Sequence, residues 1–284
     1  MPQPTVGTVH ISAPLTNISV AYMQDQARFI ATKVFPIVPV NKQTNKYFKY
    51  TKGDWFRDEA QRRAPATESA GSGYNIGSDS YSCDKFAFHK DVDDDARGNA
   101  DSGINLDADA TRFVTTRMLI RQEKQWTADA FTTSVWATDV TGGTDFVQWD
   151  DKLSDPIADV ETGRRAILAS TGYMPNKLVI GYDVYKALKH HPDILARIQY
   201  GGTAGQPAMV NTNILAEIFE LDEVLVCLAI ENSAVEGATA TMAFIQGKHA
   251  LLCYTTNAPG LMEPTAGYTF SWRAVSAGLG ADIA

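Results

Sequence analysis

The chain of 284 residues is 44% hydrophobic and 20% charged, an ordinary composition for a protein of one large or two modest globular domains. Its formal charge of −8 gives no overall sign of a protein that binds nucleic-acid phosphates. Three widely spaced cysteines without a CxxC pair argue against a zinc site and make a disulfide framework unnecessary. We find no signal peptide and no apolar run of about 18 residues, so we expect a soluble protein without a membrane partner.

Residues 1–39 have little periodic order, because prolines at positions 2, 4, 14, 36 and 39 interrupt any long element. The segment "VAYMQDQARFIATKVFP" favours one helix that begins near Asn17 or Ser19 and ends near Pro36. We therefore expect an N-terminal arm with a single anchoring helix.

Residues 40–92 favour a β-hairpin. The segment "VNKQTNKYFKYTKGDWFRDE" is rich in β-prone aromatic residues, and "YSCDKFAFHKDV" alternates between two faces. Between them, "AQRRAPATESAGSGYNIGSDS" is rich in Gly, Ser, Ala and Pro and predicts a long soft tip. An isolated two-stranded hairpin is marginally stable in water, so we expect another surface to support it.

Charge is unevenly distributed around this hairpin. Residues 41–63 carry seven basic side chains against three acidic ones, a net charge of +4. Residues 83–109 carry eight aspartates against three basic side chains, a net charge of −5. This pattern suits a basic strand that reaches onto the acidic segment of another copy, while simple solvation of two charged surfaces remains the alternative.

The clearest helix is predicted over residues 106–133, "LDADATRFVTTRMLIRQEKQWTADAFTT", with Asp107 or Asp109 as its cap. At 1.5 Å per residue it would be about 40 Å long, enough to support a whole domain.

From residue 150 onward the pattern is α/β. The sequence predicts a helix in "DPIADVETGRRAILASTG", with Pro156 in its first turn and Gly172 after its end. The segment "NKLVIG" favours a buried strand, and "YDVYKALKHHPDILARIQYG" favours one or two helices interrupted at Pro192. The segment "TNILAEIFELDEVLVCLAI" favours a helix that leads into a strand. The segment "TMAFIQGKHALLCYTT" favours two strands joined by a turn that contains glycine. A final strand carries Tyr268, Phe270 and Trp272 on one face.

The aspartate cluster "DVDDDARG" invites comparison with a calcium-binding loop. Asp91, Asp93 and Asp95 match the first three ligand positions of an EF-hand, but Ala96 and Ser102 stand where that loop requires Gly and Glu. The pattern therefore favours a structural or interface role, or plain solvation, over a metal site.

Catalytic signatures are lacking in the sequence. The adjacent His190 and His191 would point about 100° apart on a helix, and none of the motifs GxSxG, HExxH, GxxxxGK[ST] and GxGxxG occurs. The run of aromatic residues interleaved with lysines could stack on single-stranded bases, but the net charge opposes that function; its members are Tyr47, Phe48, Tyr50, Trp55 and Phe56. We expect no enzyme and no cofactor, and we keep a hydrolase and a single-strand-binding module as the less favoured alternatives.

Five segments, in this order along the chain, carry a family resemblance: "FIATKVFPIVPVNKQTNKYFKYTKGDWFRD", "RRAPATES", "DVDDDARGNADSG", "INLDADAT" and "KLVIGYDVYKALKHHPDILARI". Together with the order of the predicted elements, they make most of the chain resemble the major capsid proteins of tailed bacteriophages. The resemblance implies an α+β, Hong Kong 97-like capsid fold. Its parts would be an N-terminal arm (1–39), an extended β-hairpin loop (40–92), a peripheral domain with a long spine helix (93–149), an α/β axial domain (150–258) and a return to the peripheral domain (259–284).

The same resemblance implies a structural protein of the virion, assembled in the cytoplasm of a host bacterium. Its copies would form hexamers and pentamers of an icosahedral head around double-stranded DNA, which they would contact without specificity. A separate scaffolding protein, a portal and a decoration protein are possible further partners. An encapsulin-like compartment, which shares this fold and encloses protein cargo, is the alternative interpretation.

Contacts between copies are expected to join the basic hairpin of one copy to the acidic segment of another. Buried aromatic side chains would supply most of the adhesion, and ion pairs would set register. The candidate contact residues are Lys42, Lys46, Tyr47, Lys49, Tyr50, Lys52, Trp55, Phe56, Arg57, Arg62, Arg63, Asp91, Asp93, Asp94 and Asp95.

Overall fold

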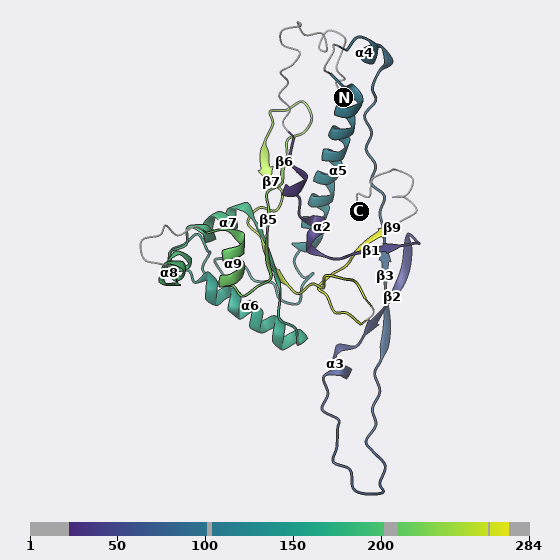
Figure 1. The fold of residues 1–284 in the computed structure, drawn as a ribbon, viewed down its shortest axis with the longest axis vertical. Coiled ribbons are helices and arrows are strands. Elements are labelled where there is room, and N and C mark those ends of the chain that lie inside the picture. Colours follow the sequence, from purple (N-terminus) through teal and green to yellow (C-terminus); the bar gives the residue numbers. More distant parts are fainter. Residues whose placement is uncertain (1–22, 101–103, 202–209, 261, 273–284) are drawn as a thin grey trace.

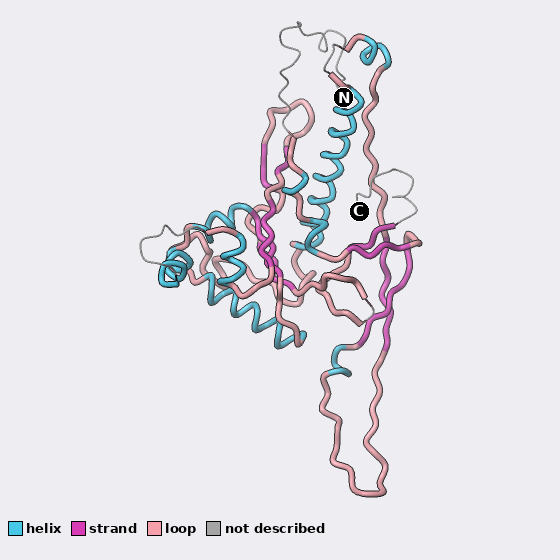
Figure 2. Tube along the Cα trace, viewed as in Figure 1, coloured by secondary structure: helices cyan, strands magenta, loops and turns pink. Residues whose placement is uncertain are grey.

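The computed structural model describes residues 23–100, 104–201, 210–260 and 262–272. A long helix, a small sheet flanked by helices and a projecting hairpin make up an elongated molecule (Figures 1 and 2). The helices are η2 (Gln26–Arg28), α2 (Ala31–Val34), α3 (Lys52–Trp55), α4 (Asp94–Gly98), α5 (Leu106–Ala130), α6 (Pro156–Thr171), α7 (Tyr182–Lys189), α8 (Pro192–Gly201) and α9 (Thr212–Ile218). The strands are β1 (Ile37–Val40), β2 (Thr44–Tyr50), β3 (Ile76–Ser82), β4 (Lys177–Gly181), β5 (Glu223–Cys227), β6 (Ile230–Asn232), β7 (Met242–Phe244), β8 (Ala250–Cys253) and β9 (Thr269–Trp272).

Helix α5 is the long helix that the sequence predicts. Its 25 residues span about 38 Å at 1.5 Å per residue. The side-chain oxygen of Asn105 caps it by accepting a hydrogen bond from the backbone N–H of Ala108 at 3.0 Å, so the expected cap at Asp107 or Asp109 is wrong. Both aspartates instead place negative charge in the first turn, where the helix dipole favours it.

The α/β part follows the predicted order of elements. Helix α6 begins with Asp155 accepting from the backbone N–H of Ala158 and with Pro156 in its first turn, and it ends at Gly172, whose φ of 77° suits a residue without a Cβ. Helices α7 and α8 are separate, as the proline at position 192 predicts. No helix in the described ranges combines the length and apolarity needed to cross a bilayer.

The central strand β4 serves two hydrophobic cores. It lies between β5, to which it is parallel, and β8, to which it is antiparallel. Leu178 and Ile180 point to one face and pack with side chains from helices α6 to α9. Val179 points to the other face and packs with Leu119 of α5 and Val34 of α2. Burial on both faces explains why this strand reads as a continuous apolar run rather than an alternating one.

Strands β7 and β8 both exist, but they do not pair with each other. Strand β7 pairs with β6, whereas β8 joins the central sheet beside β4. The turn between them crosses close to the end of β4, where a Cβ added to Gly181 would lie 1.8 Å from the carbonyl oxygen of Gly247. Glycine at position 181 therefore allows the two backbone segments to approach.

The N-terminal segment differs from the single helix predicted for it. The described part contains the two short turns η2 and α2, and the extended Phe29 (ψ 133°) separates them. Phe29, Ile30 and Val34 are all buried in the core beside α5, so tertiary packing overrides the local helical preference. The predicted start at Asn17 or Ser19 lies outside the described residues.

The hairpin consists of β2 and β3, which pair antiparallel over seven residues each. The pairing of two strands is confirmed, but the second strand lies at 76–82 rather than over the predicted "YSCDKFAFHKDV". Residues 83–92 form no strand and run toward α4, with Phe88 packing on Phe113 of α5 at 5.8 Å and Phe86 under Arg121 at 4.8 Å. Their alternation therefore reflects packing of one side against a helix, a pattern that resembles a half-buried strand in sequence.

Candidate assembly surface

The register of β2 and β3 divides the hairpin side chains between two faces. Residues directly opposite each other in an antiparallel pair point to the same face. Tyr47 and its partner Asp79 therefore share one face, whereas Phe48 and its partner Ser78 share the other. The ring of Tyr47 lies 5.8 Å from that of Phe270 in β9, so the Tyr47 face packs against the chain's own strand.

The opposite face of the hairpin, here called the free face, has no such cover from the described residues. It consists of Thr44, Lys46, Phe48 and Tyr50 and of their partners Ser82, Ser80, Ser78 and Ile76, and Tyr50 packs near Trp55 and Tyr74 of its own chain. Phe48 is 72% exposed and Ile76 is 53% exposed. Apolar side chains held in the open on a regular strand are typical of a surface that another molecule covers.

Three aromatic rings gather where the paired strands end. The centroid of Trp55 lies 5.2 Å from that of Tyr74 and 6.2 Å from that of Tyr50. The side chain of Asp54 holds this turn by accepting hydrogen bonds from both the backbone N–H and the amide group of Asn75. Trp55 and Tyr74 nevertheless remain about half exposed, so the cluster both orders the hairpin and extends its apolar surface.

Two predicted contact residues of the hairpin, Lys52 and Phe56, contact the end of helix α6 in their own chain. The Nζ of Lys52 donates to the backbone carbonyl of Ser170 at the end of α6, where the helix dipole favours a cation. The ring of Phe56 lies over Gly172, close enough that a Cβ there would be 3.0 Å from it. These contacts fix the hairpin relative to α6, although Phe56 still exposes most of its surface.

The basic residues of the hairpin are solvent-exposed and partly paired within the chain. Lys49 lies 3.8 Å from Asp79 across the strand pair, and Arg57 lies 3.4 Å from Asp54. The Lys49–Asp79 pair is exposed and worth about 0–1 kcal/mol, whereas the Asp54 side chain of the other pair is buried. Lys42, Lys46, Arg62 and Arg63 are also exposed.

The aspartate cluster forms the start of α4. Asp93 stands at the N-cap, and Arg97 binds both Asp94 and, at 2.9 Å, Asp107 at the start of α5. Among the described residues, no group of three or more His, Cys, Asp or Glu side chains could hold a metal ion. The four predicted aspartates of residues 91–95 are exposed, and the ion pairing here centres on Arg97.

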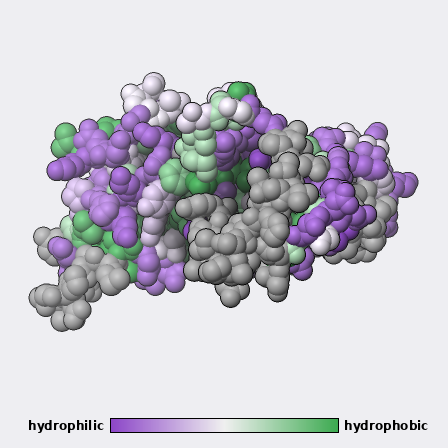
Figure 3. Space-filling model, turned by 90° about the horizontal axis from the view of Figure 1, so that it is seen from above, coloured by the Kyte–Doolittle hydropathy of each residue, from purple (hydrophilic) through white to green (hydrophobic). Residues whose placement is uncertain are grey.

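The aspartates at α4 lie far from the basic hairpin within one chain. Figure 1 shows α4 near one end of the longest axis, strands β2 and β3 near its middle and the loop that joins them toward the other end. Any pairing between them must therefore join two copies. Seen from above, hydrophilic side chains cover most of the described surface, and hydrophobic ones gather in small separate patches (Figure 3).

The nearest approach to a catalytic constellation is the buried pair Ser154 and His191. Their Oγ and Nε2 atoms are 3.0 Å apart. The Nδ1 atom of His191 accepts a hydrogen bond from the backbone N–H of Asp193, which places the ring proton on Nε2. An Nε2 that carries a proton cannot accept one from the serine, and the serine hydroxyl donates to the carbonyl of Asp151 instead. The arrangement stabilises the start of α8.

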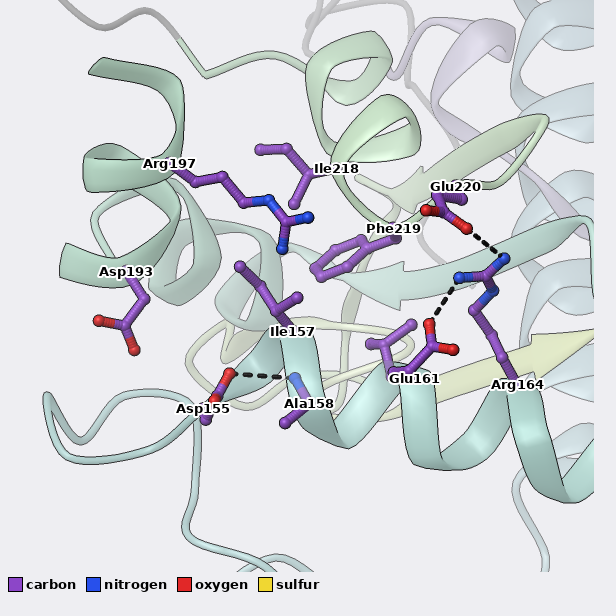
Figure 4. A pocket seen from close by; sticks show the side chains of 11 residues that line it. Asp155, Ile157, Ala158, Glu161, Arg164, Asp193, Arg197, Ile218, Phe219 and Glu220 are labelled. Atoms are coloured by element: carbon purple, nitrogen blue, oxygen red, sulfur yellow. Dashed lines mark hydrogen bonds and ion pairs between the residues drawn. The ribbon is translucent and has the colours of Figure 1, made fainter. Parts of the chain in front are cut away.

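A cavity of about 440 Å³ lies between α6, α8 and the turn after α9 (Figure 4). Apolar residues such as Ile157 and Phe219 line it together with charged ones such as Asp193 and Arg197. Arg164 donates to Glu161 at 2.6 Å and to Glu220 at 2.8 Å, as the dashed lines show (Figure 4). Arg164 thereby joins α6 to that turn, a structural arrangement, and its two carboxylate partners leave the group with a net negative charge.

Phe48, Tyr74 and Ile76 belong to the exposed surface of the hairpin but are not among the contact residues predicted from the sequence. The alternation of β2 could have separated Phe48 from Tyr47, since neighbouring strand residues point to opposite faces. Tyr74 and Ile76 could not be found in this way, because the segment around them reads as a soft loop.

No protein-family model matches the chain. Two curated proteins are similar over nearly its whole length. The major capsid protein of Burkholderia phage BcepMu is 28% identical over 264 residues, which cover 90% of this chain and 81% of that protein. The major capsid protein of Pseudomonas phage JBD67 is 27% identical over 271 residues, which cover 92% of this chain and 83% of that protein.

Solved structures share the fold. The crystal structure of a phage-related protein from Bordetella bronchiseptica RB50 matches with a TM-score of 0.62 and 25% identity, covering 88% of this chain and 80% of that one. The capsid structure of cyanophage P-SCSP1u matches with a TM-score of 0.51 and 10% identity, covering 84% of this chain and 75% of that one. The mixed helix-and-sheet architecture is thus one that occurs in a phage capsid.

Proposed function

The chain is a homologue of phage major capsid proteins, as its sequence resemblance predicts, and on that premise we propose that it builds the icosahedral head of a tailed phage. Copies assemble into hexamers and pentamers that enclose double-stranded DNA. The observation that carries this proposal is similarity to two major capsid proteins over about 90% of the chain. The protein acts structurally, and it has no catalytic role in this proposal.

The exposed surface of the projecting hairpin supports the proposal that the protein acts by assembling with other copies. One face packs on Phe270 of its own chain, while the free face presents Phe48 and Ile76 to the surroundings. A hairpin with a half-exposed aromatic cluster gains stability when a second surface covers it. We assign that surface to a neighbouring copy, because capsid subunits are surrounded by copies of themselves.

The charged segments support a contact that is specific between copies. Lys46 stands on the free face, and exposed aspartates stand at α4 toward the opposite end of the molecule. Since these segments are far apart in one chain, opposite charges on neighbouring copies can select orientation and register. The affinity then comes mainly from the aromatic side chains.

The division into arm, extended loop, peripheral domain and axial domain follows the Hong Kong 97-like plan in this proposal. Helix α5 takes the place of the spine helix, and the part formed by α6 to α9 and its sheet takes the place of the axial domain. A scaffolding protein, a portal and a decoration protein would be the further partners in the virion.

Negative-stain microscopy of the purified full-length chain, alone and after co-expression with its neighbouring phage genes, tests the proposal. Closed shells, rings or tubes of regular subunits are the expected result, and DNA inside shells recovered from virions would separate a phage head from a compartment for protein cargo. Dispersed single particles under every condition of concentration, salt and co-expression would contradict it.

A further inference from the structure

Glu123 is the one carboxylate whose side chain is completely buried among the described residues, with an exposed fraction of 0%. It projects from the middle of α5 toward the N-terminal segment. Its Oε2 atom accepts hydrogen bonds from the backbone N–H of Ile30 at 3.0 Å and of Ala31 at 2.9 Å. Its Oε1 atom accepts from the Sγ–H of Cys227 in β5 at 3.2 Å.

These bonds replace a missing helix cap. The residue at the N-cap of α2 is Ile30, whose side chain cannot accept a hydrogen bond. The first backbone N–H groups of a helix have no hydrogen-bond partner within the helix. Burying such an N–H group without an acceptor is strongly unfavourable. Glu123 provides that acceptor from a position 92 residues away from Ala31 in the sequence.

Further hydrogen bonds hold the same segment along its length. The side-chain amide of Gln24 both accepts from the backbone N–H of Ile230 at 2.9 Å and donates to its carbonyl at 2.6 Å. The carbonyl of Arg28 accepts from the N–H of Leu228 at 3.3 Å, and the carbonyl of Lys33 accepts from the Nζ of Lys177 at 3.0 Å. The segment therefore binds α5, the end of β5, the start of β6 and β4.

We propose that residues 23–34 form a clip that the side chain of Glu123 closes. The clip joins the long helix α5 to the central sheet and to the β6–β7 ribbon. Figure 1 shows α2 beside α5, close to the end of β5. Glu123 acts as a positioning residue, since it works through the backbone of Ile30 and Ala31. The clip belongs to the single chain and does not depend on the proposed assembly.

The inference predicts that an acceptor is needed at position 123, whereas a charge is not. Gln has nearly the same shape, and its carbonyl oxygen can accept from both N–H groups while its amide group faces the sulfur of Cys227. Met has a similar length but no strong acceptor, so it leaves two buried N–H groups without partners. The variants Glu123→Gln and Glu123→Met thus form a matched pair that separates hydrogen bonding from volume.

Hydrogen exchange of the full-length chain, followed by mass spectrometry or NMR, tests this inference. In Glu123→Gln, amides of residues 29–34 should exchange at about the wild-type rate. In Glu123→Met they should exchange at least about tenfold faster, since two unsatisfied buried N–H groups together cost more than the equivalent of that factor. Amides of β4 should accelerate by no more than the loss of global stability that chemical denaturation of the same variant measures. Equal protection of residues 29–34 in the two variants would overturn the clip.

The variant Gln24→Met gives a second test that does not disturb the core. It removes the outer hydrogen bonds to Ile230 and leaves Glu123 in place. Exchange should accelerate at Ile230 and over residues 25–29, while the amides of Ile30 and Ala31 stay protected. If Ile30 and Ala31 lose protection together with the outer residues, Glu123 does not close the clip and the inference is wrong. This test also decides the matter if Glu123→Met fails to fold.

Discussion

The ring of Tyr81 stacks on the ring of Phe270, with centroids 4.4 Å apart and planes 15° from parallel. This contact joins β3 of the hairpin to β9 near the other end of the sequence. Because Tyr47 packs on the same Phe270 ring, one face of the hairpin is anchored and the other is left free. The hairpin thus projects from the body in a fixed orientation.

The substitution Phe48→Ser should weaken assembly without unfolding the subunit. Phe48 is 72% exposed, so the folded single chain loses little when the ring is removed. A neighbouring copy that covers the free face would lose the burial of one aromatic side chain, about 1.5–3 kcal/mol per contact. Light scattering would show a higher threshold concentration for assembly, and circular dichroism would show an unchanged melting temperature.

The control for that substitution is Tyr81→Leu, which disturbs the anchored face. It should lower the free energy of unfolding by about 1 kcal/mol, because it removes the stack on Phe270. A Phe48→Ser variant that assembles at the wild-type threshold would contradict the assignment of the free face.

Charge reversal at Lys46 and Lys49 should block assembly of otherwise folded subunits. Lys46 lies on the free face, where a glutamate would repel an acidic neighbouring surface. Lys49 lies beside Asp79, so Lys49→Glu alone mainly removes an exposed pair worth about 0–1 kcal/mol. We therefore expect Lys46→Glu to account for most of the effect of the double variant in electron microscopy. If the double variant forms normal shells, opposite charges do not select the contacts between copies.

Acidification should stabilise the wild-type chain relative to Glu123→Gln. Burial raises the pKa of Glu123, against the opposing effects of the N–H groups of Ala31 and Ile30, the Cys227 thiol and the charge of Lys33. A carboxyl group with a raised pKa in the folded state binds its proton more tightly there, so its contribution is lost as pH rises through that pKa. Burial also raises the pKa of Cys227 to about 12, so its thiol stays protonated throughout.

Chemical denaturation from pH 7 down toward the ordinary carboxyl pKa of about 4.3 measures this effect. The free energy of unfolding of the wild type, minus that of Glu123→Gln, should increase as the pH falls. Taking the difference removes the titration of the other carboxylates. A difference that stays constant or decreases would mean that burial does not dominate the titration of Glu123.

The substitution Gly181→Ala should lower the free energy of unfolding by at least about 3 kcal/mol. A Cβ at this position would lie 1.8 Å from the carbonyl oxygen of Gly247, and backbone atoms cannot move aside as a flexible side chain can. The matched control is Gly53→Ala in α3, where an added Cβ meets no atom within 4 Å. Thermal denaturation that places both variants within about 1 kcal/mol of the wild type would contradict the close approach.

Helices whose ends are marked by nearby capping residues, prolines or glycines could be predicted from the sequence. Asp155, Pro156 and Gly172 mark the ends of α6 through capping and backbone geometry, which involve only neighbouring residues. The long helix α5 and the break at Pro192 are equally local signals. The resemblance to phage capsid proteins arises from the order of such elements, so it too was within reach of the sequence.

Features that depend on distant partners could not be predicted. Strand β1 pairs with β9 in a parallel register that joins Val38 to Phe270, and no local pattern specifies that partner. The role of Glu123 depends on backbone groups 92 and 93 residues away. The free face of the hairpin required the register of β2 and β3, which placed the second strand in a segment of Gly and Ser that predicts a loop.

The most direct measurement of the central claim is an electron cryomicroscopy map of the assembled particle at side-chain resolution. We expect a closed shell in which Phe48 and Ile76 of each hairpin lie buried against a neighbouring copy, while Tyr47 and Tyr81 remain on Phe270 of their own chain. Shells in which the Phe48 face stays open to solvent would contradict this claim, and so would a chain that remains monomeric under every condition.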